Sequence, residues 1–421
     1  SALLCLPAAS KRGEPTDFLT SLFTATSATC VTGLVRVDTG TYWSGFGQAV
    51  ILVMIQIGGL GFMTIASIFF FALRRKIGLR QRLAQALSFD QISGVVGLVR
   101  NVLLGTLAVE GAGALILMLR FWPEFGLGRA VWYGVFHSVS AYCNAGFDVL
   151  GDLASGGSLC GYVDDPVVNL TIMALITIGG LGFAVWGDIR KNRRFSRLSV
   201  YSRLVVAISL GLTLGGAAVI ALLEWNNPGT IGGLTAGGKV LASLFQSVTL
   251  RTAGFASFDQ NALRDVTKAV CDVLMFVGGS SGSTAGGVKT VTVGVLVLAA
   301  VGTARGRTHI TAFKRTIPQS TVANAGSIAL LMLTLGAVGA GTIAVIDGVS
   351  FENAIYETIS ALCTVGLTTG ITSGLGLASC LILIIFMFFG RVGIMTISVG
   401  FMMANPAEDR ITYAQTRVMI G

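Results

Sequence analysis

The sequence is poor in charged residues and in histidine, and each shortage excludes a class of protein. Charged residues make up 12% of the 421 positions, and histidine occurs only at His137 and His309. With no HExxH motif and no Ser/His/Asp arrangement, we expect no enzyme. The seven cysteines form no CxxC pair and no metal-ligand spacing, so we interpret them as packing residues rather than disulfides or metal ligands.

The sequence also lacks a nucleotide-binding loop. Gly282 and Gly287 have the right spacing, but Val288 separates Gly287 from Lys289 and no strand is expected before them. The net charge of +9 does not predict nucleic-acid binding, because the basic residues cluster in three segments, 74–82, 190–203 and 305–315. We therefore expect no covalently bound cofactor and no nucleic-acid partner.

Apolar residues dominate the composition. They make up 53% of the chain, the mean hydropathy is +0.78, and several windows of about 20 residues are long enough to cross a bilayer. The alternative, a large soluble protein with buried helices, is disfavoured by the number of such windows. Glycine is abundant, with 56 residues, and permits both close helix packing and non-helical backbone. We predict an all-α protein that crosses the membrane several times.

Four short segments match one another in type and order. They are Ser27-Ala-Thr-Cys-Val-Thr-Gly33, Ser140-Ala-Tyr-Cys-Asn-Ala-Gly146, Val248-Thr-Leu-Arg-Thr-Ala-Gly254 and Ser360-Ala-Leu-Cys-Thr-Val-Gly366. Their glycines are 113, 108 and 112 residues apart. Such a repeat predicts four copies of one unit around a central pore, with the turn as its filter. Four ordinary helix-ending glycines would be the alternative.

Each unit has the pattern of a spanning helix, a short helix, a glycine turn and a second spanning helix. We expect the units at 1–75, with the leading helix mostly missing, and at 76–192, 193–305 and 306–404, followed by a cytoplasmic tail at 405–421. The expected short helices are 17–28, 130–142, 239–250 and 351–362. The expected spans are 48–73, 95–121, 166–189, 201–224, 268–300, 321–346 and 375–403.

The short helices are too short to span, so the turns after them should face the axis, where backbone carbonyls can replace the water around a cation. The helix C-termini add negative dipole ends there. The predicted filter residues, with K⁺ at their carbonyls, are Cys30, Val31, Thr32, Gly33, Cys143, Asn144, Ala145, Gly146, Arg251, Thr252, Ala253, Gly254, Cys363, Thr364, Val365 and Gly366.

The second spans align at Ile57-Gly-Gly, Ile178-Gly-Gly, Val277-Gly-Gly and Phe389-Gly-Arg, and the last two units depart from the pattern. The third continues as a polar, flexible run that cannot face lipid, and the fourth carries Arg391 in the middle of an apolar span. We predict a gate below the filter made by Gly278, Gly279, Ser280, Ser281, Gly282, Ser283, Thr284, Ala285, Gly286, Gly287, Lys289 and Arg391. An exposed loop between two shorter helices is the alternative for the polar run.

Charge sets the expected orientation. By the positive-inside rule the three basic segments are cytoplasmic, and the filter turns open outward. Acidic residues, among them Asp38, Asp148 and Asp259, follow the turns and could attract cations. Ordinary solvated loop acids explain them equally well.

The turns Asn144-Ala-Gly-Phe147, Arg251-Thr-Ala-Gly-Phe255 and Thr364-Val-Gly-Leu-Thr-Thr-Gly370 resemble the pore loops of the Trk/Ktr/HKT superfamily of potassium transporters. The size and the ending at 411–421 are closer to KtrB-type membrane subunits than to the larger TrkH. The resemblance implies four M1-P-M2 units in pseudo-fourfold arrangement, potassium uptake and a glycine, here Gly33, that favours K⁺ over Na⁺. It also implies an intramembrane loop and an arginine at the constriction.

For partners, the resemblance implies a homodimer in the lipid of the bacterial plasma membrane. It further implies a cytosolic RCK-type ring like KtrA, through which alone ATP or ADP would act, and Na⁺ as a candidate activator. A secondary transporter built from inverted repeats is disfavoured, because all four units have the same orientation. The sequence leaves open whether conduction is channel-like or Na⁺-coupled.

Overall fold

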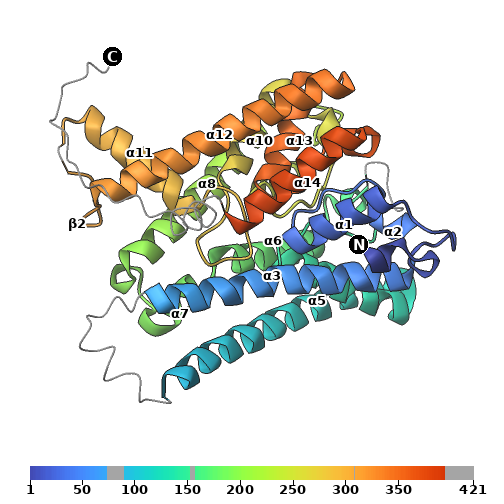
Figure 1. Ribbon diagram of the computed structural model, residues 1–421, viewed down its shortest axis with the longest axis horizontal. Helices are drawn as coiled ribbons and strands as arrows, with labels where there is room; N and C mark the ends of the chain where they lie inside the picture. The colour runs from blue at the N-terminus through green and yellow to red at the C-terminus, as the bar shows by residue number, and fades with distance from the viewer. Residues whose placement is uncertain (74–89, 152–156, 308, 394–421) are drawn as a thin grey trace, which may run out of the picture.

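The computed structural model describes residues 1–73, 90–151, 157–307 and 309–393, and its secondary structure there is almost entirely helical, with turns and loops between the helices. The only strands there, β1 (Thr311–Ala312) and β2 (Arg315–Thr316), form a short antiparallel pair. The α-helices (Figure 1) are α1 (Phe18–Cys30), α2 (Thr39–Tyr42), α3 (Gly45–Leu73), α5 (Asp90–Tyr142), α6 (Pro166–Leu181), α7 (Phe183–Asn192), α8 (Val200–Glu224), α9 (Ala236–Thr249), α10 (Asp265–Phe276), α11 (Thr290–Ala304), α12 (Gln319–Asp347), α13 (Phe351–Leu362) and α14 (Leu377–Val392).

The predicted short helices are present as α1, the last part of α5, α9 and α13. Side-chain caps fix where three of them begin, because a side-chain oxygen accepts a hydrogen bond from an otherwise unpaired backbone N–H of the first turn. Asp17 caps α1, Thr235 caps α9 and Ser350 caps α13. In the second unit the long span and the short helix form one element, α5, interrupted at Gly126, where φ is 74°.

One predicted span is wrong. We expected a continuous helix over 166–189, but α6 ends at Leu181, and α7 leaves at an angle of 93°. The bend lies at Gly182, which has φ of 79° and lies against the loop of the third unit: a Cβ added there would be 2.8 Å from the carbonyl oxygen of Gly282. The third unit's second span is broken as expected, into α10 and α11.

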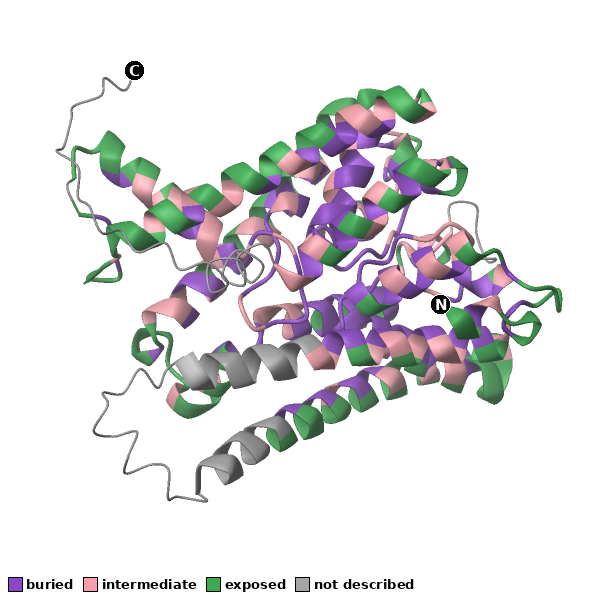
Figure 2. Ribbon diagram, viewed as in Figure 1, coloured by how far each residue is buried: buried purple, intermediate pink, exposed green. Residues whose placement is uncertain are grey.

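The short helices connect neighbouring units in a cycle. The short helix α1 packs on its own second span α3 and on α14 of the fourth unit. Similarly, α5 packs on α3, α9 on α6 and α13 on α10, so that each short helix meets the second span of the preceding unit. Buried residues concentrate along these contacts in the middle of the molecule (Figure 2).

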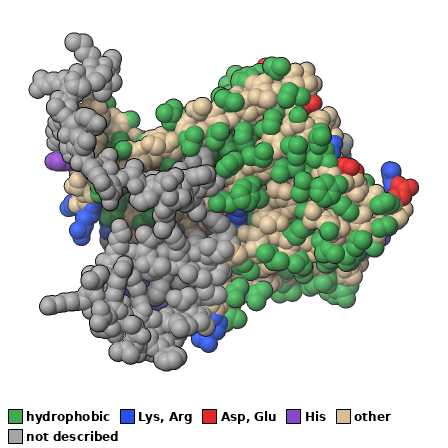
Figure 3. Space-filling model, in the orientation of Figure 1, with side chains coloured by type: hydrophobic (Ala, Val, Ile, Leu, Met, Phe, Trp, Pro, Cys, Tyr) green, Lys and Arg blue, Asp and Glu red, His purple; other side chains and the backbone are tan. Residues whose placement is uncertain are grey.

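The outer faces of the long helices are apolar. Exposed side chains include Leu222 on α8 and Leu330 and Val345 on α12, and hydrophobic side chains cover much of the face seen in Figure 3. In the described part of the chain, three helices, and α6 with α7 as a bent fourth, are long and apolar enough to span. The chain is a multi-pass membrane protein. The basic segment 74–82, the fourth span beyond 393 and the tail 405–421 lie outside the described residues.

Candidate functional site

The four predicted filter turns share one pattern of positive φ angles. In each, the residue two positions before the glycine has a positive φ, which is uncommon for a side chain other than glycine. These residues are Val31, Asn144, Thr252 and Thr364, with φ of 56°, 58°, 69° and 51°. The glycines themselves have φ of 99°, 67°, 80° and 95° in chain order. The sequence repeat is therefore a structural repeat.

The four glycines also lie in a closed ring. A Cβ added to Gly33 would lie 2.5 Å from the carbonyl oxygen of Ala145, and one added to Gly146 would lie 2.7 Å from that of Ala253. In the same way Gly254 abuts the carbonyl of Val365, and Gly366 abuts that of Thr32. Each glycine thus faces the carbonyl that precedes the next glycine, and the fourth returns to the first. This close approach, together with positive φ, requires glycine at each place.

Hydrogen bonds inside the turns occupy N–H groups but leave carbonyl oxygens without a backbone donor. The N–H groups of Thr32, Ala145 and Val365 donate to the carbonyl oxygens of residues five positions earlier, at 2.8, 2.7 and 2.7 Å. The third turn differs, because Ala253 donates to Thr249 at 2.9 Å. Among the described backbone bonds, none ends on the carbonyls of 31–33, 144–146, 252–254 or 364–366. These oxygens can therefore coordinate a cation.

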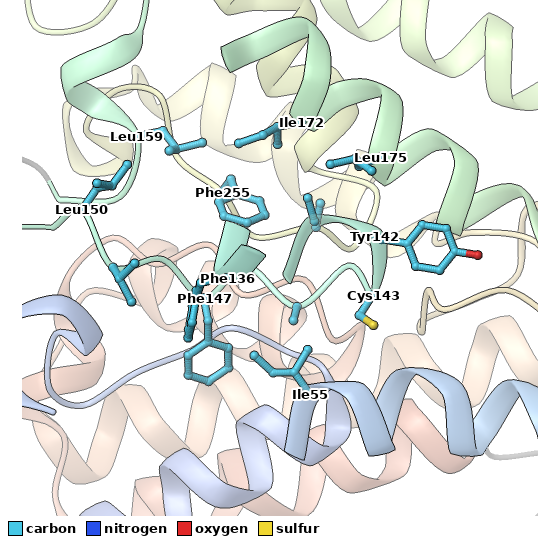
Figure 4. Close-up of a cluster of buried hydrophobic side chains, with 14 of the residues drawn as sticks. Ile55, Phe136, Tyr142, Cys143, Phe147, Leu150, Leu159, Ile172, Leu175 and Phe255 are labelled. Carbon is cyan, nitrogen blue, oxygen red and sulfur yellow. The ribbon is translucent and has the colours of Figure 1, made fainter. Parts of the chain in front are cut away.

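The second turn is supported from behind by packed apolar side chains (Figure 4). Phe136, Phe147 and Phe255 lie around it, together with Ile172 and Leu175 of α6. This packing fixes the turn's position, since a well-packed interior resists displacement.

The thiol of Cys143 points to a polar group behind the same turn. Its sulfur lies 3.8 Å from Oε1 of Gln56 and 3.9 Å from Oε1 of the buried Glu110. Cys30 and Cys363 occupy the same offset in their turns and are also buried, and all seven cysteines are free. Gln56 on α3 donates to Glu110 on α5 at 3.0 Å. The sequence analysis missed this pairing, although an acid inside the apolar span 95–121 was an available signal.

The polar run of the third unit lies folded against the second and fourth turns. Its two ends meet, because Gly278 N donates to Val288 O at 2.9 Å and Thr290 Oγ1 donates to Gly278 O at 2.7 Å. Ser280 N donates to Gly180 O at 3.1 Å, beside the bend of the second unit. Thr284 Oγ1 donates to Tyr142 O, immediately before the second turn, at 3.2 Å. The run is thus held inside the protein rather than exposed between helices.

The remaining members of the predicted gate lie with this loop. Ser280, Ser283, Thr284 and Ala285 are buried, and Lys289 Nζ closes the loop by donating to Ala285 O at 2.8 Å. Gly286 and Gly287 lie against Thr364 and Cys363 of the fourth turn. Gly282 and Gly287 have positive φ, which permits the reversals of the chain there.

Arg391 joins three units at this level. It is 6% exposed, and its guanidinium donates to the carbonyl oxygens of Thr284 in the loop and of Gly58 on α3. The hydrogen bonds satisfy two of its donors inside the protein, as a charge at membrane depth requires. A positively charged side chain therefore lies between the loop and α3.

The acids that follow the turns have local structural roles. Asp38 caps α2 through Thr41 N at 2.7 Å, and Asp259 caps η5 (Gln260–Ala262) through Asn261 N at 2.9 Å. In the short 3₁₀ segment 160–162, burial raises the pKa of Cys160 to about 12, so this thiol is neutral. Within the described residues, no three His, Cys, Asp or Glu side chains form a metal-binding group.

Comparison with known proteins gives a consistent result. A family model described as TrkH, cation transport protein, matches residues 4–413. The chain is 39% identical to Ktr system potassium uptake protein B of Bacillus subtilis and 38% identical to potassium/sodium uptake protein NtpJ of Enterococcus hirae, covering 100% of this chain and 93% of each relative. Its fold is similar to the crystal structure of the potassium transporter TrkH from Vibrio parahaemolyticus, with a TM-score of 0.70 and 18% identity over 94% of this chain and 83% of that one.

Proposed function

The chain belongs to the TrkH family of cation transport proteins, and from that premise we propose that it is the potassium-conducting membrane subunit of a Ktr-type uptake system. Members of this family are ion transporters rather than enzymes. Relatives named as potassium or potassium/sodium uptake proteins, similar over the whole chain, support this cargo.

One observation carries the proposal: the closed ring in which each filter glycine faces the carbonyl before the next. Four backbone turns of equal conformation can offer a dehydrated K⁺ a ring of carbonyl dipoles without a full charge. The four units then surround one pore as pseudo-fourfold M1-P-M2 repeats at 1–75, 76–192, 193–305 and 306–404, with the tail at 405–421.

The gate we propose is the loop 278–287 with Lys289 and Arg391. Hydrogen bonds of the loop to Gly180 and Tyr142, and of Arg391 to the loop, support a closed position beneath the ring. Opening would require the loop to leave these partners while its ends stay joined at Gly278 and Val288. Such a local movement is compatible with a loop rich in glycine and serine.

The setting is part of the proposal. The subunit would lie in the bacterial plasma membrane with the turns outward and the basic segments cytoplasmic, as a homodimer. A cytosolic RCK-type ring of the KtrA kind would bind its cytoplasmic face and bring ATP or ADP control, with Na⁺ as an activator. The names of relatives as proteins of a Ktr system support a multi-component assembly.

The test is growth of an uptake-deficient bacterium at low potassium, with this chain expressed alone or with a ring subunit, and with rubidium and sodium uptake measured in parallel. We expect rescue, rubidium entry and little sodium entry, greatest with the ring. Absence of any cation flux from well-expressed, membrane-inserted protein with the ring would overturn the proposal.

A further inference from the structure

One position of the short helices differs between the units in an informative way. Nine residues before each filter glycine stand Thr24, His137, Phe245 and Glu357, all fully buried. At this position the side chain can reach the irregular segment of chain that follows the turn. Two of the four residues accept a hydrogen bond from that segment.

In the second unit His137 holds the strand after Gly146. Its Nδ1 lies 2.7 Å from the carbonyl oxygen of Tyr133. Because a carbonyl oxygen can only accept, Nδ1 carries the hydrogen and Nε2 is left as an acceptor. The N–H of Val149, three residues after the glycine, donates to Nε2 at 3.4 Å. Val149 is itself buried, so its N–H needs this partner.

In the fourth unit Glu357 holds the strand after Gly366. The hydroxyl of Thr368 donates to its Oε1. Thr368 is two residues after Gly366, and Val149 is three residues after Gly146. The two side chains therefore hold neighbouring points of the segments that follow two different turns.

In the other two units the described residues show no hydrogen bond from this position to the segment after the turn. The hydroxyl of Thr24 is buried without a hydrogen-bond partner among the described residues, and Phe245 is apolar. In the third unit the next residue, Gln246, instead donates to Gln260 at 2.6 Å, farther from the filter. Because the ring runs in chain order, the second and fourth turns lie opposite each other.

We propose that His137 and Glu357 are positioning residues, which hold the outward ends of two opposite filter turns and thereby set the preference for K⁺ over Na⁺. The inference rests on the proposed function. Selectivity depends on how many carbonyl dipoles face the ion and how firmly they are held, so releasing the strand after a turn changes it. Neither side chain touches the ion.

The test compares rubidium and sodium uptake by purified protein in liposomes. His137→Phe installs the residue of the third unit and removes the acceptor, whereas His137→Gln keeps an oxygen near the place of Nε2. Glu357→Leu and Glu357→Gln form the same pair in the fourth unit. Thr24→Val is the matched control, because it removes a hydroxyl without a partner at the equivalent position.

We expect His137→Phe and Glu357→Leu to lower the rubidium-to-sodium ratio by about tenfold, which corresponds to about 1.4 kcal/mol, the scale of one buried hydrogen bond. The glutamine variants should recover most of the ratio, and Thr24→Val should match the wild type. If a leucine or phenylalanine variant does not fold, as judged by size-exclusion chromatography, Thr368→Val removes a donor to Glu357 without altering the buried carboxylate and should also lower the ratio.

The outcomes separate this inference from the function on which it rests. A wild-type protein without rubidium flux would overturn the proposed function. A selective wild type whose ratio is unchanged by His137→Phe, Glu357→Leu and Thr368→Val would overturn the positioning role alone. Loss of selectivity in the glutamine variants as large as in the apolar ones would also overturn it, since the retained acceptors should hold the strands.

Discussion

Arg391 on α14 donates a hydrogen bond to the carbonyl oxygen of Thr284, 107 residues away in the chain and inside the loop of the third unit. A second donor of the same guanidinium reaches Gly58 on α3. One side chain thus ties the loop to the first and fourth units. The tie is made to backbone atoms, so it depends on how the loop is folded and not on its side chains.

Replacing Arg391 with Ala should raise rubidium uptake, because the change removes both the tie to the loop and a positive charge beside the proposed ion path. Arg391→Lys should have a smaller effect, since it keeps the charge but cannot donate to two carbonyls in the same fork. Uptake into proteoliposomes measures both. Unchanged uptake by folded Arg391→Ala protein would show that Arg391 does not restrict the ion path.

Shortening the segment 280–287 should also raise uptake, because the hydrogen bonds that hold the loop beneath the ring are lost. The measurement is initial rubidium uptake per folded protein. Ser327→Ala, on an exposed face of α12, controls for effects of expressing, purifying and reconstituting an altered protein. Equal or lower uptake by the shortened protein, with normal size-exclusion behaviour, would contradict a gating role.

Gly33→Ser should admit more sodium. A Cβ at this position meets the carbonyl of Ala145 and the Cα atoms of two neighbouring glycines, so the ring must widen or distort. Gly13→Ser is the matched control, because Gly13 also has positive φ but nothing lies within 4 Å of its added Cβ. The rubidium-to-sodium ratio is the readout. If both variants retain wild-type selectivity, the first turn is not part of the filter.

Gly58→Ala should destabilise the protein by about 1–3 kcal/mol, the usual cost of forcing atoms into a packed interior. Its added Cβ would collide with the carbonyl of Thr29 at the end of α1. Gly61→Ala, one turn along α3, has open space at its Cβ and should be neutral. Thermal unfolding in detergent compares the two. Similar melting temperatures would mean that α1 can move away from α3 at little cost.

Much of the candidate site could be predicted from sequence because it depends on a repeat. The four glycines, their spacing and the short helices before them follow from local pattern, and all four turns have positive φ at the same two positions. The break in the third unit was also predictable, since a polar glycine-rich run cannot continue an apolar helix against lipid. Arg391 was recognisable as an isolated charge in an apolar span.

The bend at Gly182 could not be predicted, because the segment around it is identical in pattern to that of α3, which stays helical there. What differs is the partner. The loop of the third unit packs against Gly182, and Ser280 of that loop donates to the carbonyl oxygen of Gly180 beside the bend. The support of the second and fourth turns by His137 and Glu357 was equally hidden. It depends on strands that return beside the short helices only after folding.

The sequence by itself determined the membrane class and the four repeated turns, because hydropathy and glycine periodicity act locally along the chain. Only the tertiary structure decided that each filter glycine faces the carbonyl that precedes the next filter glycine. It also decided that the loop is hydrogen-bonded to Gly180 and Tyr142, and that Arg391 binds both the loop and α3. These relationships join residues about 100 or more positions apart, and their energies come from close packing and buried hydrogen bonds that exist only when all four units are assembled.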